Sequence, residues 1–470
     1  MGLAATTEAW ARAAVGQPDL GDARRVRRAH HLVTAMIERP TASIPEACGN
    51  WADTKAAYRF WDTGQRLPDL PDRLRAGHTQ ATKAHLAGAG RILAVQDTTS
   101  LNWTHHPATT GLGPIGTEER SRGLLVHSTL AVTPTGVPLG LLDQQVWARD
   151  VTTRGKRHTR RTRATAEKES QKWLDGVTRA HADLPAGVTL VHVGDAESDV
   201  YDLFVQAQAT PGTQLLIRAA QDRRTATGQH LWATLEAERV ADVRAIDLPR
   251  TPERAPRQAR LTLRWTRVTL APPRNRKAGL AAVTLDAILV AEIDPPEGVP
   301  PVVWLLLTTV PVLTLEDAWE RVGWYRYRWR IERYHLVLKS GCRIEERQLR
   351  TAARLESCLA LYAIVAVRVL QVTELARETP DAPATGLVST TEWRLLWLAR
   401  HPDQSPPTEA PTLREVVREI AQFGGFLARK GDGEPGVITV WRGFQRLHDL
   451  VRGFHLAQSL AAYDEAQKYG

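Results

Sequence analysis

The chain has 470 residues, of which 43% are apolar, so it can bury a large core and we expect two or three domains. Its 61 Lys and Arg residues exceed its 52 Asp and Glu residues, and this net charge of +9 favours a nucleic acid or another anionic partner. Three widely spaced cysteines argue against a disulfide framework or a cysteine zinc site, and we find no secretory signal and no membrane span.

The N-terminal stretch 1–70 reads as helical and basic. Its clearest segment, LGDARRVRRAHHLVTAM, places Arg24 and Arg25 in a dense positive patch at a helix start. The following stretch SIPEACGNWADTKAAYRFWD predicts a second small helical unit with Lys55 and Arg59 on its polar side. A basic all-helical module of this kind suits insertion of a helix into a DNA major groove, although a solvated helix end explains the charge equally well.

From about residue 90 the periodicity changes to that of strands. RILAVQ is a short apolar strand that ends at Asp97, and LLVHSTLAV and VPLGLLDQQVWA are two further strands joined by a TPTG turn. A helix follows the basic loop at 152–163. The next predicted strand, VTLVHVG, has Asp195 at its carboxyl end, and a further predicted strand, QLLIR, ends at Arg218. The predicted order is therefore β-β-β-α-β-α-β, with one acid on the first strand and one just past the fourth.

The stretch 235–302 is rich in predicted strands, and we interpret it as a β-subdomain inserted into an α/β core. The turn APPRNRKAG between two of these strands carries Arg274, Arg276 and Lys277. This basic tip suits contact with DNA, and an exposed hairpin tip with solvating charge explains it at least as well.

A strand and a long helix occupy the stretch from 304 to 341. The strand WLLLT precedes a turn, and Thr314 with Asp317 three residues later predicts a capping box at the start of one continuous helix. A further apolar helix, a Pro-rich linker at 401–412 and a C-terminal helical segment follow.

Inside that long helix, Tyr325, Arg328, Glu332 and Lys339 share one predicted face. At about 100° and 1.5 Å per residue, their side chains fall within an arc of about 60° along about 21 Å of helix. A solvated, ion-paired helix face is the simpler interpretation of such a stripe. One carboxylate among Tyr, Arg and Lys also suits a polyanion that lies along the helix beside a metal-bound reacting centre.

The spacing Y-x2-R-x3-E-x6-K of this stripe resembles the signature of the insertion-sequence-four group of DDE transposases. QDTTSLNW resembles the segment around the first catalytic Asp of that family, and GDAESDVYDLF resembles the segment around the second. The usual D-R-E-A-D of the second segment is D-A-E-S-D here, with Ala196 in place of the family Arg. The segments LGDxRR and AAYRFW resemble the family's end-binding domain.

The resemblance implies that Asp97, Asp195 and Glu332 are the catalytic residues and the metal ligands. Phosphodiester cleavage requires a strong nucleophile and charge neutralisation, which two divalent ions about 3.5–4 Å apart supply. Mg²⁺ prefers oxygen ligands and keeps several waters, so a few carboxylates on separate elements suffice, and we expect that Mn²⁺ can substitute. The implied layout is that of ribonuclease-H-like nucleotidyl transferases, in which distant carboxylates converge at the centre of a sheet.

The resemblance also implies contacts with DNA. Trp304 corresponds to a family tryptophan associated with a flipped base during hairpin formation, although a core tryptophan is the simpler interpretation of its strand position. Position 336 is Leu where a relative carries a Lys, so we expect one contact to be absent. The predicted DNA-binding residues are Trp304, Tyr325, Arg328, Lys339, Arg218, Arg24, Arg25 and Arg59.

The resulting expectation is an α/β protein with a ribonuclease-H-like core and a β-rich insertion, flanked by helical N- and C-terminal domains. The predicted domains are 1–70 for binding transposon ends, 71–370 for catalysis with the insertion at 235–302, and 371–470 for dimerisation. Because the N-terminal module is present, we expect the full enzyme rather than a shortened inhibitor form.

The expected function is cut-and-paste transposition by a homodimer on paired ends of double-stranded DNA, through terminal inverted repeats, hairpin intermediates and joining to target DNA. No P-loop pattern is present, so we expect no nucleotide cofactor, and the expected location is the bacterial cytosol or nucleoid, away from membranes. Two alternatives remain: a ribonuclease-H-like nuclease that cuts without strand transfer, and a DNA-binding derivative that has lost catalysis.

Overall fold

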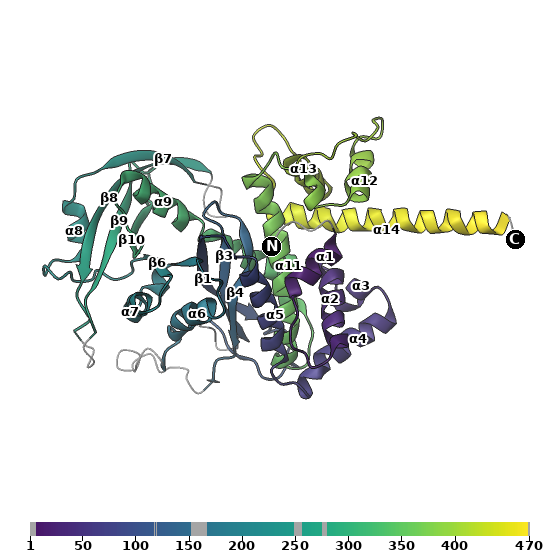
Figure 1. Cartoon of the computed structure of the whole chain (residues 1–470), viewed down its shortest axis with the longest axis horizontal. Coiled ribbons are helices and arrows are strands. Elements are labelled where there is room, and N and C mark those ends of the chain that lie inside the picture. Colours follow the sequence, from purple (N-terminus) through teal and green to yellow (C-terminus); the bar gives the residue numbers. More distant parts are fainter. Residues whose placement is uncertain are drawn as a thin grey trace.

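The computed structural model describes residues 6–116, 118, 120–151, 167–248, 256–274 and 280–468. A mixed sheet forms the body of the protein, and helices of the two ends of the chain lie together at one side of it (Figure 1). The predicted basic loop at 152–163, together with Arg276 and Lys277 of the predicted basic tip, lies outside the described residues.

The N-terminal region is helical, as the sequence predicts. Side-chain caps define its helix starts: Asp22 accepts a hydrogen bond from the Arg24 amide, and Ser43 forms a capping box with Glu46. The guanidinium of Arg347, which precedes the long helix near the middle of the fold, donates to the main-chain carbonyls of Ala42 and Pro40 and fixes this region to the core. The helices are α1 (Thr7–Val15), α2 (Ala23–Glu38), α3 (Ile44–Cys48), α4 (Trp51–Asp62) and α5 (Leu70–Ala84).

In the described part of the chain, the central sheet has ten strands in the order β2-β3-β1-β5-β6-β10-β9-β8-β7, and β4 pairs with β3 beside this path. The pairs β1–β5 and β5–β6 are parallel, and the other pairs are antiparallel. The strands before the insertion are β1 (Arg91–Asn102), β2 (Gly113–Pro114), β3 (Arg122–Val132), β4 (Pro138–Trp147), β5 (Thr189–Gly194) and β6 (Thr213–Arg218). Helices α6 (Gln171–His181) and α7 (Tyr201–Ala209) connect the last of these strands, so the predicted β-β-β-α-β-α-β order is present once the two-residue β2 is set aside.

The β-rich stretch after β6 extends the same sheet and does not form a separate one. Strand β10 pairs with β6 on one side and with β9 on the other, so the inserted strands continue the core sheet outward. This part comprises α8 (Leu231–Ala237), β7 (Asp242–Leu248), β8 (Arg257–Leu270), β9 (Val283–Ile293) and β10 (Val303–Thr308).

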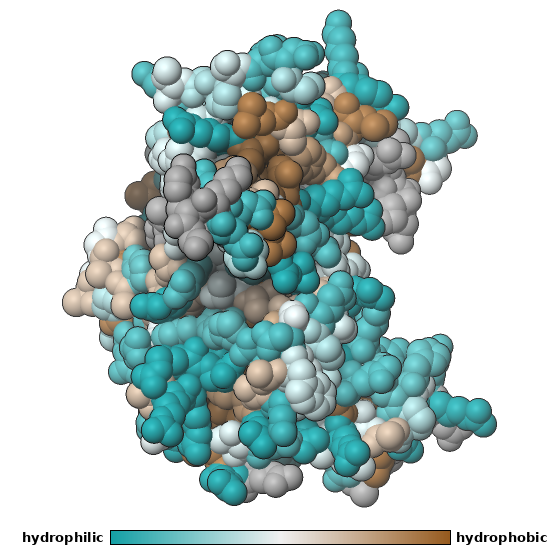
Figure 2. All heavy atoms as spheres, turned by 90° about the vertical axis from the view of Figure 1, so that its right-hand side faces the viewer, coloured by the Kyte–Doolittle hydropathy of each residue, from teal (hydrophilic) through white to brown (hydrophobic). Residues whose placement is uncertain are grey.

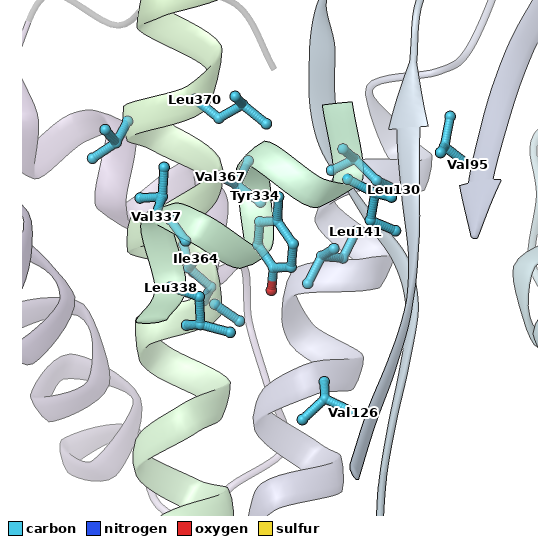
Figure 3. Close-up of a cluster of buried hydrophobic side chains, with 14 of the residues drawn as sticks. Val95, Val126, Leu130, Leu141, Tyr334, Val337, Leu338, Ile364, Val367 and Leu370 are labelled. Carbon is cyan, nitrogen blue, oxygen red and sulfur yellow. The ribbon is translucent and has the colours of Figure 1, made fainter. Parts of the chain in front are cut away.

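A long helix, α11 (Ala352–Glu378), passes through the core against the other elements. Its side chains Ile364, Val367 and Leu370 face Tyr334 and strand residues such as Leu141 (Figure 3). Among the described helices, α11 alone is long and apolar enough to cross a membrane, but 94% of its most apolar window is buried inside the protein. Burial within the fold therefore accounts for its apolar composition.

The C-terminal region contains α12 (Thr390–Arg400), α13 (Leu413–Phe423) and α14 (Val437–Lys468). The last helix extends well beyond the body of the protein (Figure 1). Apolar groups gather on the face from which it projects (Figure 2), and the large apolar side chains that the helix exposes are Ile438, Phe454, Leu456, Leu460 and Tyr463. A projecting helix end with such exposed side chains is suited to pack against another molecule.

The prediction of one continuous helix after Thr314 is wrong. The capping box of Thr314 and Asp317 is confirmed, but the helix is divided into α9 (Leu315–Arg326), α10 (Trp329–Leu336) and a π-helical turn at Val337–Gly341.

The helix is divided because its hydrogen-bond pattern changes at two places. Around Tyr327 the amides bond three residues back, as from Arg328 to Tyr325, and at the far end the Cys342 amide bonds five residues back to Val337. Both irregularities change the rotation per residue, so the four predicted side chains do not form one straight stripe.

Candidate active site

Two of the predicted acids occupy matching positions of neighbouring parallel strands, Asp97 on β1 and Asp195 just past the end of β5. Val95 of β1 pairs with Val193 of β5, and Asp97 and Asp195 each follow two residues later. The prediction that the first strand ends at Asp97 is wrong, because β1 continues to Asn102. Strand β5 stops at Gly194, so Asp195 follows its end directly and lies level with Asp97. Asp195 also accepts a hydrogen bond of 2.8 Å from the Glu197 amide and caps a short 3₁₀ turn there.

The third predicted acid, Glu332, approaches from α10. Its Oε1 lies 2.8 Å from Nη1 of Arg328, one helical turn earlier. Burial raises the pKa of Asp97 to about 6; the Thr98 amide and Arg328 lower it, whereas repulsion from Asp195 and Glu332 raises it further. Asp97 is therefore close enough to Asp195 and Glu332 to be repelled by both, and Arg328 partly compensates this charge.

The donor set of this site fits divalent metal ions. Its carboxylates provide the hard oxygen ligands that Mg²⁺ prefers, and a cation would replace the hydration that the buried Asp97 carboxyl has lost. Within the described ranges, no three Asp, Glu, His or Cys side chains lie together as a ready cage for one ion. The ion pair with Arg328 occupies Glu332, and Mg²⁺ requires only one or two protein carboxylates per ion.

Electrostatic interactions link three further predicted residues, Tyr325, Arg218 and Lys339, to the acids or to their neighbours. Tyr325 is buried, and burial raises the pKa of its hydroxyl above the ordinary value. The charges of Arg328 and Arg218 oppose this rise, and the charge of Asp195 adds to it. Arg218 is exposed at the end of β6. Lys339 lies in the π-helical turn and acts electrostatically on His335.

Trp304 lies in the protein core with 6% of its surface exposed. Its ring contacts Tyr325 at 5.5 Å and Trp329 at 5.9 Å between centroids. Trp329 is 40% exposed, and the Arg328 guanidinium lies 5.3 Å from its ring centroid. The accessible aromatic face at this site therefore belongs to Trp329 rather than to Trp304.

Sequence reasoning missed two residues of this site. Trp329 is four residues from Tyr325, and His335 is three residues from Glu332, so the helical periodicity used for the stripe would have placed both nearby. His335 Nδ1 lies 3.8 Å from Oδ2 of Asp97. Burial, with a smaller effect of Lys339, lowers the pKa of His335 to about 3, so its imidazole is neutral.

The two acids after Asp195 support the surrounding loops. Glu197 is exposed and pairs with Lys172 at 2.9 Å. Asp199 is buried, where it binds the Arg223 guanidinium and accepts hydrogen bonds from the Ala220 and Gln221 amides. Asp199 therefore fixes the loop that immediately follows Arg218.

A separate group of predicted contacts lies in the N-terminal helices. Arg24 is exposed, whereas Arg25 is half-buried and donates to the Leu20 carbonyl at 2.8 Å. Arg59 is exposed on α4, whose accessible face also carries Trp51. An exposed aromatic residue beside basic residues on one helix face is a suitable DNA-binding surface.

Comparisons with known families cover most of the chain. Residues 145–368 match the transposase DDE domain, and residues 7–65 match the transposase DNA-binding family. Residues 364–465 match the transposase Tn5 dimerisation domain. The chain belongs to the DDE transposases.

The family matches confirm several predictions for this transposase. They confirm the α/β class with a ribonuclease-H-like DDE fold, the transposase activity, the binding of DNA and the formation of a dimer. The DDE match includes Asp195 and Glu332 but begins after Asp97. The place of Asp97 in the transposase site therefore depends on the β1–β5 register described above.

One solved structure is similar to part of the transposase. It is a cryo-EM structure of a piggyBac transposase synaptic complex with hairpin DNA. The similarity covers 79% of this chain and 67% of that chain, with 9% sequence identity and a TM-score of 0.35. A likeness at this level carries no argument about this transposase.

Proposed function

We propose that this transposase moves DNA by a cut-and-paste reaction whose active site is Asp97, Asp195 and Glu332. The observation that carries the proposal is the convergence of these acids from β1, the end of β5 and α10, with Arg328 between them. The same residues would serve a nuclease or an inactive DNA-binding derivative, so the experiment below separates these alternatives.

In the proposed reaction, water attacks the phosphorus at each element end and the 3′ oxygen leaves as a free hydroxyl. That hydroxyl attacks the opposite strand and closes a hairpin, which releases the flanking DNA. A second water opens the hairpin, and the regenerated 3′-hydroxyl attacks a target phosphodiester, whose own 3′ oxygen leaves. The two attacks by water are hydrolyses that consume one phosphodiester each, and the two attacks by a 3′-hydroxyl are transesterifications that form one phosphodiester for each one broken. The sequence therefore requires no nucleotide cofactor.

The three carboxylates would hold two Mg²⁺ ions, or Mn²⁺ in their place. Ions bound there supply an activated nucleophile and neutralise charge on the reacting phosphate. Arg328, Lys339 and Arg218 would bind the flanking phosphates, and the Tyr325 hydroxyl would donate to a phosphate oxygen.

An extruded base would stack at the pair of Trp304 and Trp329. A hairpin bends the strand too sharply for an unstrained base stack, and an aromatic surface stabilises the displaced base. The exposed Trp329 would provide the contact, and the buried Trp304 would support it from below.

We further propose that residues 1–70 bind the terminal repeats through Arg24, Arg25 and Arg59, and that residues 71–370 catalyse the reaction. Residues 371–470 would join two protomers on paired ends, with the projecting α14 as the natural contact. The DNA-binding match at 7–65 and the dimerisation match at 364–465 support these boundaries. The reaction would take place in the bacterial cytosol or nucleoid.

A Mg²⁺-dependent cleavage assay tests the proposal on DNA that flanks the reading frame. Glu332→Gln removes the proposed ligand, and Glu346→Gln, at an exposed acid paired with Arg343, is the matched control. We expect hairpin and strand-transfer products from the wild type and the control, and no cleavage by Glu332→Gln. Cleavage without joining would indicate the nuclease, binding without cleavage would indicate the inactive derivative, and cleavage by Glu332→Gln would overturn the assigned site.

A further inference from the structure

The helix that carries Glu332 is short and irregular at both ends. Helix α10 has eight residues, a tightened turn precedes it and a π-helical turn follows it. A helix of this length has little stability of its own, so packing against the rest of the protein must hold it. The position of the Glu332 carboxylate therefore depends on the contacts made by the other faces of α10.

Apolar packing supplies one set of these contacts. Tyr334 of α10 and Val337 and Leu338 of the following turn face Ile364 and Val367 of α11 (Figure 3). Apolar contacts are not directional, so they hold the helix against the core but define its rotation and height only loosely. A shift of about 1 Å in a reacting group is enough to cost about 100-fold in rate.

A buried acid supplies directional contacts at the same place. Glu374 of α11 is 0% exposed, and its Oε2 lies 2.7 Å from Nη1 of Arg330, while its Oε1 lies 2.8 Å from Nη1 of Arg333. Arg330 and Arg333 flank Glu332 on α10. Charged hydrogen bonds have defined lengths and directions, so these two pairs fix both the rotation and the height of the helix.

The same acid connects α10 with two further segments. Arg330 also donates to the carbonyl of Gly136 in the β3–β4 turn, at 3.0 Å. Arg377 binds Glu374 at 3.1 Å and donates to the carbonyl of Pro435, just before α14, at 2.9 Å. Glu374 is thus the point at which the catalytic helix, the core helix and the start of the projecting helix are joined.

We propose that Glu374 is a positioning residue of the transposase active site, which holds α10 so that Glu332 faces Asp97 and Asp195. The inference rests on the proposed catalytic role of Glu332. Glu374 touches neither substrate nor metal in this role and acts through Arg330 and Arg333. Without the charge of Glu374, the largely buried guanidinium groups of Arg330 and Arg377 lose their common partner and repel one another. This repulsion turns α10 away from its position.

Glu374→Gln tests this role, because it keeps the shape of the side chain and removes the charge. The matched control is Glu356→Gln, on the same helix, whose carboxylate lies 4.0 Å from Arg75 of α5. For Glu374→Gln we expect a cleavage rate lower by about 10–100-fold and a higher half-saturating Mg²⁺ concentration. Binding of terminal-repeat DNA should remain within about two-fold of the wild type, because the N-terminal helices are unchanged.

A second measurement does not depend on activity. In metal-free protein, hydrogen exchange of the α10 amides should become faster in Glu374→Gln than in the wild type, whereas the central strands should keep their protection. The control Glu356→Gln should leave the α10 amides as protected as in the wild type.

Arg333→Gln provides the deciding variant if Glu374→Gln fails to fold. Arg333 is partly exposed, and its loss leaves Glu374 with two arginine partners, so we expect a folded protein with a smaller fall in rate. Wild-type rates and exchange in the folded variants would overturn the positioning role, provided that cleavage by the wild type requires Glu332. If the wild type shows no Glu332-dependent cleavage, the proposed function itself fails and the positioning role fails with it.

Discussion

The Arg328 guanidinium lies 2.8 Å from the Glu332 carboxylate, one turn along the same side of the catalytic helix. Without metal, the positive charge of this guanidinium offsets part of the repulsion that Asp195 and Glu332 exert on Asp97. Ions bound at these acids would take over part of that compensation. The charge balance of the site therefore links its stability to metal binding.

Arg328→Met should lower the stability of the metal-free protein more than that of the protein with excess Mg²⁺. We expect a loss of about 1–2 kcal/mol without metal, because an ion pair that is only partly exposed is broken. Thermal unfolding with and without Mg²⁺ measures the difference. Arg326→Met, at an exposed neighbour, is the control and should change stability little in either condition. Equal losses with and without Mg²⁺ would contradict the link.

Asp97 should make the metal-free protein less stable as pH rises. Its pKa is about 6 in the folded protein and 3.8 ordinarily, so between these values the folded state binds a proton that the unfolded state does not. Stability from this group is therefore full below about pH 4 and is lost as pH rises to about 6, by about 2–3 kcal/mol.

Asp97→Asn removes this dependence and tests it directly. Without metal, the variant should be more stable than the wild type at pH 8 and similar to it at pH 4, as measured by denaturant unfolding. Mg²⁺ should stabilise the wild type at pH 8 more than the variant, because the variant has lost one of the three proposed carboxylate ligands. A variant no more stable than the wild type at pH 8 would show that Asp97 is not under electrostatic strain.

The two tryptophans at the site should respond differently to truncation. Trp304→Ala removes a buried side chain and should lower stability by about 3–5 kcal/mol. Trp329→Ala removes an exposed ring, so it should leave the unfolding transition nearly unchanged and reduce hairpin formation relative to first-strand nicking. Denaturant unfolding and gel separation of nicked and hairpin products measure the two effects. An unchanged ratio of hairpin to nick in Trp329→Ala would remove this residue from the proposed mechanism.

Much of the core could be predicted from local pattern. Short apolar runs placed β1 and β5, and the sequence has an acid after each of these runs. Thr314 and Asp317 carry a cap that depends only on a spacing of three residues. These features depend on neighbours in the chain, so the sequence contains the information directly.

The division of the predicted long helix into α9, α10 and a π-helical turn could not be predicted in this way. No Pro or Gly marks the break at Tyr327 in the sequence. The Tyr327 ring packs closely against Gly136, where an added β-carbon would lie 2.4 Å from the ring. Glu374 was equally hidden, because no motif distinguishes it from the other acids of α11 and its partner Arg333 is 41 residues away. Contacts between distant segments determine both features.

The crossing of α13 and α14 offers the last prediction. Gly424 and Gly443 lie where these helices touch, and a β-carbon at Gly443 would lie 1.7 Å from the Ile420 carbonyl oxygen. Gly443→Ala should therefore force the helices apart, lower the thermal midpoint of the C-terminal region and weaken dimer formation. The matched control is Gly453→Ala on the same helix, where a β-carbon meets nothing within 4 Å. Because Ala favours helix by about 1 kcal/mol over Gly, the control should be as stable as the wild type or more so in thermal unfolding of dilute protein. Equal behaviour of the two variants would show that the close crossing does not hold α14 in place.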